Sequence, residues 1–289
     1  TLHIMTKNFF KYFAVAAVLY VFYLFTTLPT SCSLNTGKQE NEEIYDSDSV
    51  ETFDNVARAD ALSEDIFSFI CLVEGGVLNE KTGENYHCGA RWTTWYGVTT
   101  TPDGKFLKKG QRIPKATAKA WAFYHLRKNV YPFLAYFDHK LTDEQIIGIC
   151  LFAYNVGGEA LTGYSVQGEK LKEPCEFFIA VNNGDAPEEC VNKMTEYRKS
   201  AGKRANGLLK RHWVQGAAYL GILTSNNIGE LEPRKFYQTK NFGNYYWVDK
   251  ERQPLEDENG FYKMRYDDAT VNTFFNMNEG VNVTVNSIK

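Results

Sequence analysis

The chain has 289 residues, which suffice for one large domain or two small ones. Its formal net charge of −3 gives no electrostatic reason to expect a nucleic-acid partner, so we expect none. Hydrophobic residues make up 44% of the chain and aromatic residues 15%, enough to build a packed core, which excludes a chain that is disordered throughout.

The first 32 residues have the layout of a secretory signal. Lys7 and Lys11 precede an uncharged apolar run, residues 12–25, which polar residues and Cys32 follow. The pattern predicts a signal peptide, with a lipoprotein anchor through Cys32 or a retained membrane anchor as alternatives. We therefore expect an exported protein, periplasmic, envelope-anchored or secreted, whose residues 1–32 have the envelope membrane as a partner.

A polar and acidic segment follows at residues 33–62. Few of its side chains are apolar, so it cannot bury enough surface to order itself. We predict a disordered linker between the envelope and a folded domain.

An amphipathic helix is predicted from Ser63, its N-cap, to Glu74, where the pair Gly75-Gly76 stops it. Its apolar side chains recur at helical spacing, at Ile66, Phe69, Ile70 and Val73. The negative end of the helix dipole and an apolar neighbourhood both disfavour the ionised form of Glu74, which suits a general acid. The alternative is a solvated glutamate at a helix end.

Further helices are predicted after a Gly-rich and aromatic stretch. Pro114 opens one, and Thr142 caps another that runs to Gly157 and forms the central core helix. Residues 193–221 form closing helices, whose basic side chains we interpret as a solvated face, with binding to an anionic wall as the alternative. We interpret His212 as a surface residue.

The last segment, residues 225–289, is dense in Phe, Tyr and Trp, with Asn259-Gly260 as a hairpin signal. We predict a small β-rich appendage whose aromatic side chains pack against the preceding domain. Stacking of these rings on the sugars of a cell wall is the alternative.

The histidines and cysteines show no C-x-x-C, no H-E-x-x-H and no close His pair, so we expect no metal. After Cys32 the chain has an odd number of cysteines, so at least one stays free or pairs between molecules. These cysteines are Cys71, Cys88, Cys150, Cys175 and Cys190.

Several motifs resemble those of the phage-type lysozymes, glycoside hydrolase family 24. Glu74 opens E-G-G-V-L, Tyr86 opens Y-H-C, and T-T-W-Y-G-V-T runs from Thr93 to Thr99. Three further motifs follow in the order of the family, and together the motifs span roughly residues 63–222. The later motifs are L-F-A-Y-N-V-G from Leu151, N-N-G-D from Asn182 and G-L-L-K-R from Gly207.

The resemblance implies an α+β, mainly α-helical, lysozyme-like fold with a small β-hairpin lobe and a helical lobe, over residues 63–224. It implies that Glu74 is the general acid and that Thr93 positions a water. Tyr96, Gly97 and Asn155 are the implied substrate-binding residues. No cofactor is implied, and we expect a monomer.

A third catalytic position carries Asp in most of the family. The alignment places Cys88 there, or His87, and an insertion in the hairpin also brings Glu80 and Glu84 near the site, either of which could supply the carboxylate. Glycoside hydrolysis normally uses two carboxyl groups, so Cys88 would have to act as a thiolate nucleophile or base. The alternative for Cys88 is a buried or disulfide-bonded structural residue.

The predicted function is a bacteriolytic N-acetylmuramidase of the endolysin type, which hydrolyses the β-1,4 bond between N-acetylmuramic acid and N-acetylglucosamine in peptidoglycan. One alternative is a lytic transglycosylase that uses Glu74 alone. Another is a non-catalytic envelope protein that binds peptidoglycan on a lysozyme fold.

Overall fold

The computed structural model describes residues 54–74, 86–88, 91–200, 202–229, 231–233 and 235–277, all within one compact unit, Glu51–Lys289. The predicted signal or membrane anchor, residues 1–32, lies outside the described residues. Within the described ranges, no helix combines the length and the apolar character that a membrane span requires.

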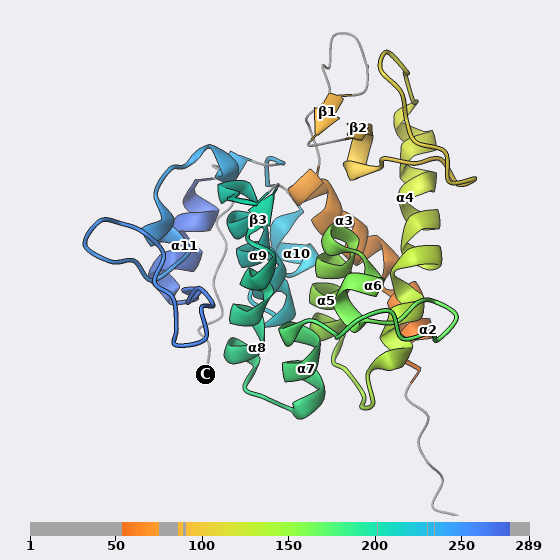
Figure 1. Cartoon of the computed structure of the whole chain (residues 1–289). Helices are drawn as coiled ribbons and strands as arrows, with labels where there is room; N and C mark the ends of the chain where they lie inside the picture. Colours follow the sequence, from red (N-terminus) through yellow and green to blue (C-terminus); the bar gives the residue numbers. More distant parts are fainter. Residues whose placement is uncertain are drawn as a thin grey trace, which may run out of the picture. The chain divides into compact units, whose positions relative to one another are not determined.

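Helices dominate the unit, and a small antiparallel hairpin stands beside them, which confirms the predicted α+β, mainly α-helical class (Figure 1). The helices are α2 (Asn55–Ala61), α3 (Ser63–Glu74), α4 (Lys115–Asn129), α5 (Asp143–Val156), α6 (Gly158–Thr162), α7 (Glu176–Asn183), α8 (Pro187–Lys193), α9 (Asn206–Tyr219), α10 (Ser225–Ile228) and α11 (Asp268–Asn276). Shorter 3₁₀ turns are η1 (Trp95–Gly97), η2 (Tyr131–Tyr136), η3 (Met194–Tyr197), η4 (Lys235–Gln238) and η5 (Phe242–Asn244). The strands β1 (Tyr86–Cys88) and β2 (Arg91–Thr93) pair with each other, as do β3 (Lys199–Ser200) and β4 (Lys203–Arg204).

Helix α2 corrects the predicted boundary of the linker, because residues 54–62 belong to the fold. The side chain of Asp54 accepts a hydrogen bond from the Ala57 N–H at 2.7 Å and caps the helix. Asn55 is buried and bonds to His139 O at 3.0 Å, and Ala59 is fully buried. This polar segment therefore packs through Asn55 and Ala59, and its overall composition does not predict that packing.

Helix α3 begins at Ser63 and ends at Glu74, as predicted. Ser63 is not its N-cap, however, since α2 leads into it through Leu62 and the Ser63 hydroxyl donates to the carbonyl of Asp60 at 2.7 Å. The apolar stripe is buried as expected, which fixes the direction in which the last residue of the helix points.

Helices α5 and α9 form the centre of the unit. The predicted capping box of α5 is present, with Thr142 and Gln145 each bonding to the backbone of the other. The two helices approach closely at Gly148, where a Cβ atom would lie 2.4 Å from Tyr219 Cβ and 2.7 Å from its Cα. Only a glycine fits at this crossing.

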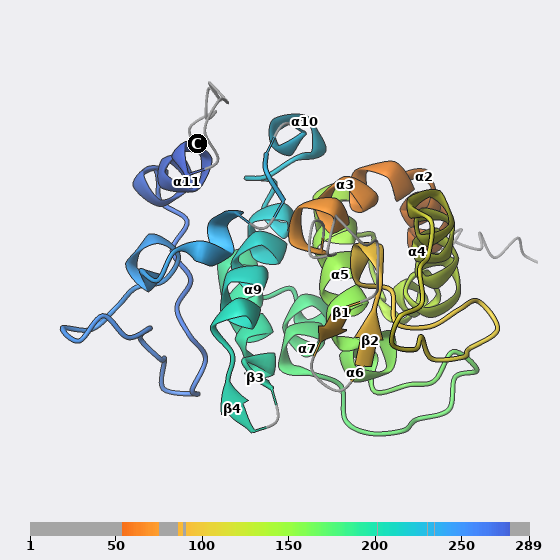
Figure 2. The same cartoon turned by 90° about the horizontal axis from the view of Figure 1, so that it is seen from above.

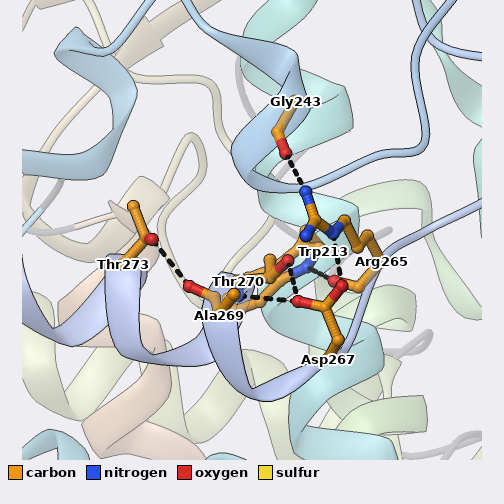
Figure 3. Close-up of polar contacts among 7 residues, drawn as sticks. All are labelled: Trp213, Gly243, Arg265, Asp267, Ala269, Thr270 and Thr273. Atoms are coloured by element: carbon orange, nitrogen blue, oxygen red, sulfur yellow. Dashed lines mark hydrogen bonds and ion pairs between the residues drawn. The ribbon is translucent and has the colours of Figure 1, made fainter.

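The C-terminal extension packs on the side of α9 opposite α5, as both views show (Figures 1 and 2). Trp213 of α9 is its centre, fully buried, with ring centroids 5.3 Å from Tyr245 and 5.0 Å from Phe274. The Trp213 indole N–H donates to Arg265 O at 2.8 Å, and Arg265 in turn bonds to the Gly243 carbonyl and pairs with Asp267, which caps α11 (Figure 3). The predicted packing of the aromatic segment against the preceding domain agrees with these contacts.

The extension holds less regular β-structure than predicted. Its described part forms isolated antiparallel bridges instead of longer strands, namely Tyr246 with Met264, Val248 with Pro254, and Glu256 with Tyr262. Tyr262 N–H donates to the Thr195 hydroxyl at 2.9 Å, and the Met264 N–H donates to the side chain of Asn192 at 2.8 Å. Backbone donors that could extend a strand ladder therefore bind side chains of the helical part.

The predicted turn at Asn259-Gly260 is present. Gly260 has a φ of +82°, and its N–H donates to the carbonyl of Asp257 at 3.0 Å. The Asn-Gly pair thus predicted the turn correctly, although the long strands expected on either side of it did not form.

Replacing a helical glycine by alanine usually stabilises a protein, but the close crossing at Gly148 predicts that alanine destabilises it there. Gly148→Ala should lower the free energy of unfolding by about 1–3 kcal/mol, because the new Cβ atom overlaps the Tyr219 backbone. Gly207→Ala, also in a helix but with its nearest neighbour 3.9 Å away, should leave stability equal or raised by about 0.5 kcal/mol. Urea unfolding of both variants tests this, and equal stabilities would contradict the tight crossing.

Candidate active site

A cleft of about 480 Å³ opens where α3, β2, η1, α4, α5 and α9 meet. Its polar lining holds one carboxylate among the described residues, Glu74, together with two guanidinium groups and an imidazole. The residues that line it are Glu74, Arg91, Thr93, Gly97, Val98, Thr99, Thr100, His125, Tyr154, Asn155, Val156, Gly157 and Arg211.

Glu74 is the last residue of α3 and is buried, with 9% of its surface exposed. Its Oε1 atom lies 2.8 Å from Nη1 of Arg211, which α9 brings from the other side of the cleft. The sequence of α3 alone does not predict this cation, because Arg211 is distant from it in the chain. Arg211 ends the motif G-L-L-K-R, and we predicted that it lies on a solvated face. That prediction was wrong, because only 17% of its side chain is exposed.

Gly97 packs closely against the carboxyl group of Glu74. A Cβ atom at this position would lie 2.9 Å from both Cδ and Oε2 of Glu74, and Gly97 has a φ of +77°. Both the space and the backbone conformation therefore require glycine here. The preceding residue, Tyr96, also has a positive φ, 63°, and its carbonyl accepts a hydrogen bond from Tyr154 Oη at 2.7 Å.

The guanidinium of Arg211 contacts further acceptors. Nη1 donates to Oδ1 of Asn155, at the end of α5, and Nε donates to the Tyr237 hydroxyl at 3.4 Å. Asn155 thus lies in the cleft as predicted, and its described contact is to the arginine that faces Glu74. A planar guanidinium with several acceptors is restricted in orientation.

Thr93 and Thr94 carry buried hydroxyl groups without a hydrogen-bond partner among the described residues. Thr93 lines the cleft and is 2% exposed, and Thr94 is fully buried. A buried hydroxyl without a partner loses free energy of hydration, so an oxygen or nitrogen of a bound molecule near Thr93 gains a hydrogen bond.

The structure brings together four of the predicted site residues, Glu74, Thr93, Gly97 and Asn155. Tyr96 stands apart from the lining. Its ring is 6% exposed and packs edge-on against Phe67, with a centroid distance of 4.8 Å.

The third predicted catalytic position is described only by its backbone. Cys88 on β1 lies opposite Arg91 on β2, Tyr86 lies opposite Thr93, and His87 lies opposite Trp92. Both Arg91 and Thr93 line the cleft. The side chains of Cys88 and His87, and the whole of Glu84, lie outside the described residues.

His125 is a lining residue that the sequence did not assign to the site. Burial lowers the pKa of its imidazole, whose Nδ1 atom lies 2.8 Å from the side-chain nitrogen of Asn129. Its ring meets that of Tyr154 edge-on at 5.2 Å. His125 therefore adds a neutral ring to the wall of the cleft.

His212 was predicted to lie at the surface, and this was wrong. It is fully buried, with Nδ1 2.8 Å from Gln215 Oε1 and Nε2 3.4 Å from Tyr197 O. Burial lowers the pKa of His212 to about 4. The neighbouring Lys210 is also buried, because the C-terminal extension covers the face of α9 that would otherwise be solvated.

The cysteines whose side chains the structure describes are free thiols, and none of them lines the cleft. They are Cys71, Cys150, Cys175 and Cys190. Within the described part of the chain, no cluster of three or more His, Cys, Asp or Glu side chains could hold a metal ion.

The cleft of this mainly helical fold sets a buried glutamate beside an arginine and a threonine hydroxyl, and one such carboxyl group can serve as the acid of a glycoside hydrolase. The family model for phage lysozyme matches residues 80–213. This match agrees with the resemblance that the motifs indicated. Glu74 lies just before the matched segment, so its assignment depends on the E-G-G-V-L motif and on its contact with Arg211.

The solved structures that are similar to the chain include a phage endolysin and a muramidase domain. The endolysin from Escherichia coli O157:H7 phage FAHEc1 has 21% identity and a TM-score of 0.43, covering 54% of this chain and 92% of its own. The muramidase domain of SpmX from Asticaccaulis excentricus has 20% identity and a TM-score of 0.40, covering 54% of this chain and 93% of its own. A comparison with curated proteins found no match.

The buried His212 predicts a loss of stability in acid. Its pKa in the folded chain, about 4, is below the ordinary 6.5, so between these values the unfolded chain binds a proton that the folded chain does not. Stability should therefore fall as the pH falls through this window, by an amount of the order of 3 kcal/mol. Thermal unfolding from pH 7 to pH 4 should show this loss reduced in His212→Gln.

The matched control is His139→Gln, which changes a partly exposed histidine. It should retain the pH dependence of the parent. If His212→Gln lost as much stability in acid as the parent, the buried imidazole of His212 would not be the cause of that loss.

Proposed function

We propose that the protein is a muramidase that hydrolyses the β-1,4 bond between N-acetylmuramic acid and N-acetylglucosamine in peptidoglycan. The observation that carries the proposal is the placement of Glu74, buried at the end of α3 with its carboxyl group in a cleft between Arg211 and Gly97. The match to the phage lysozyme family supports the same substrate.

Glu74 acts as the general acid in this proposal. It transfers a proton to the glycosidic oxygen as the bond to the sugar breaks, which leaves a carboxylate on Glu74. Arg211, at 2.8 Å, stabilises that negative charge where it develops, and the cleft limits competition from bulk water. The Thr93 hydroxyl positions the water that completes hydrolysis.

The second catalytic group is proposed to be Cys88, with His87 and Glu84 as alternatives. The pairing of Cys88 with Arg91, on a strand that lines the cleft, supports this choice. The thiolate would act as a base toward water or as a nucleophile toward the sugar carbon.

A lytic transglycosylase is the second candidate function, because Glu74 is the single carboxylate among the described residues of the cleft. In that reaction a hydroxyl of the substrate replaces water as the nucleophile, and one acid/base group suffices. Mass spectrometry of the released fragments separates the two, since transglycosylation leaves anhydro ends and hydrolysis leaves reducing ends.

Export also belongs to the proposal. The signal-like composition of residues 1–32 supports delivery of a monomeric enzyme to the periplasm, the envelope or the medium, with attachment to the envelope membrane where the segment is retained. Peptidoglycan lies in these compartments, so substrate and enzyme would meet there.

Substitution of the proposed acid tests the function. Glu74→Gln should lower the rate at which the enzyme clears a peptidoglycan suspension by at least about 100-fold, because the amide cannot donate the proton at the required acidity. Glu64→Gln, in the exposed first turn of the same helix, should clear it at the parent rate. A parent that sediments with the wall and releases nothing would contradict catalysis and favour the binding protein.

Cys88→Ala in the same assay decides the role of the thiol. A loss of about 100-fold or more with unchanged stability would identify Cys88 as the second catalytic group. Activity equal to the parent would reject that role and direct attention to Glu84 and His87.

The contact between Gly97 and Glu74 gives a further test. Gly97→Ala should lower kcat by about tenfold or more, because the new methyl group displaces the Glu74 carboxyl. Gly104→Ala is the control: Gly104 has a similar φ of +79°, but a Cβ atom there would have no neighbour within 4 Å. The activity of this variant should equal that of the parent. Equal kcat values for both variants would show that Gly97 does not position the acid.

A further inference from the structure

The C-terminal extension contacts the site through Tyr237. This tyrosine belongs to η4, after the segment that matches the lysozyme family model. Its hydroxyl accepts a hydrogen bond from Nε of Arg211 at 3.4 Å, and Arg211 is the residue whose Nη1 lies 2.8 Å from Glu74. One guanidinium therefore joins the extension to the proposed catalytic acid.

We propose that the extension is part of the active site, with Tyr237 as a positioning residue that holds Arg211 in the orientation in which it stabilises Glu74. The inference deepens the proposed function and rests on it. Tyr237 acts through Arg211 and has no assigned contact with the reacting atoms.

The backbone of η4 is fixed to α9 by the residue next to Arg211. Lys210 is 3% exposed, and its Nζ donates to the carbonyls of Tyr237 at 3.1 Å and Phe236 at 3.4 Å. The rings of Phe242 and Tyr245 also lie about 6 Å from this ammonium. A buried ammonium is stable only where such groups replace water, so Lys210 ties η4 to α9.

The ring of Tyr237 is held as firmly as its backbone. It stacks on Phe236 with a centroid distance of 4.4 Å, and Phe236 is fully buried and packs against Phe274 of α11 at 5.5 Å. The ring also lies near Gly207 in the first turn of α9, where a Cβ atom would be 3.9 Å from its Cδ1 and Cε1 atoms. The position of the hydroxyl is therefore determined by the extension.

Arg211 then has acceptors on three separate elements. Glu74 lies on α3, Asn155 at the end of α5 and Tyr237 on η4. The other charged or titratable groups of the cleft are Arg91 from β2, which has no acceptor, and His125 from α4, whose Nδ1 already accepts from the Asn129 side-chain nitrogen at 2.8 Å. Loss of the Tyr237 hydroxyl removes the acceptor at Nε, so the orientation of the guanidinium is less restricted, although Glu74 and Asn155 still contact Nη1.

Two hydroxyl deletions in the extension separate positioning from stability. Tyr237→Phe should lower kcat about three- to tenfold with KM unchanged, because the carboxylate formed on Glu74 is stabilised less well. Tyr246→Phe removes a fully buried hydroxyl that donates to Leu209 O at 2.6 Å, away from Arg211. It should lower the unfolding midpoint and leave kcat equal to that of the parent.

A second measurement is independent of turnover. The NMR signals of the Arg211 guanidinium report rotation about its Nε–Cζ bond; rotation should be slow in the parent and in Tyr246→Phe, and faster in Tyr237→Phe. Parent-like kcat and parent-like rotation in Tyr237→Phe would overturn the inference, as would equal effects of the two variants. A parent that lacks turnover would reject the proposed function, while the rotation rates would still decide whether Tyr237 fixes Arg211.

Discussion

The ion pair between Glu74 and Arg211 is the interaction on which the geometry of the site depends. It joins α3 to α9 across the cleft, with 10% and 17% of the two side chains exposed. A pair so little exposed is stable only if its remaining hydrogen-bonding groups are satisfied, and Asn155 and Tyr237 accept from the same guanidinium. Helix α5 and the C-terminal extension thus both contribute acceptors to the guanidinium of the ion pair.

The C-terminal extension contributes to the burial of charged side chains along α9. Lys210, Arg211 and His212 are consecutive, and none of them is freely solvated. Burial lowers the pKa of Lys210 to about 8 and that of His212 to about 4, so both groups carry a cost that specific partners offset. The extension supplies carbonyl oxygens and aromatic rings for Lys210, which makes it part of the same folding unit.

Local sequence signals predicted the elements that bear the site. The apolar stripe of α3 placed Glu74 at a helix end, and the capping box at Thr142 placed the start of α5. The motifs identified Thr93 as a lining residue. Burial of His212 was not predictable in this way, because a single apolar stripe predicts one buried face, whereas α5 and the extension bury α9 on two sides. The partner of Glu74 is distant in sequence, and no spacing rule pairs the two.

The central claim is that Glu74 faces the bond to be broken. A crystal structure of Glu74→Gln with a bound peptidoglycan oligosaccharide tests it most directly, because the substituted enzyme retains the shape of the cleft and does not cleave the ligand. We predict a glycosidic oxygen within about 3 Å of the residue 74 side chain, near Arg211 and Thr93. An oligosaccharide bound elsewhere, or with its glycosidic oxygens out of reach of residue 74, would contradict the account.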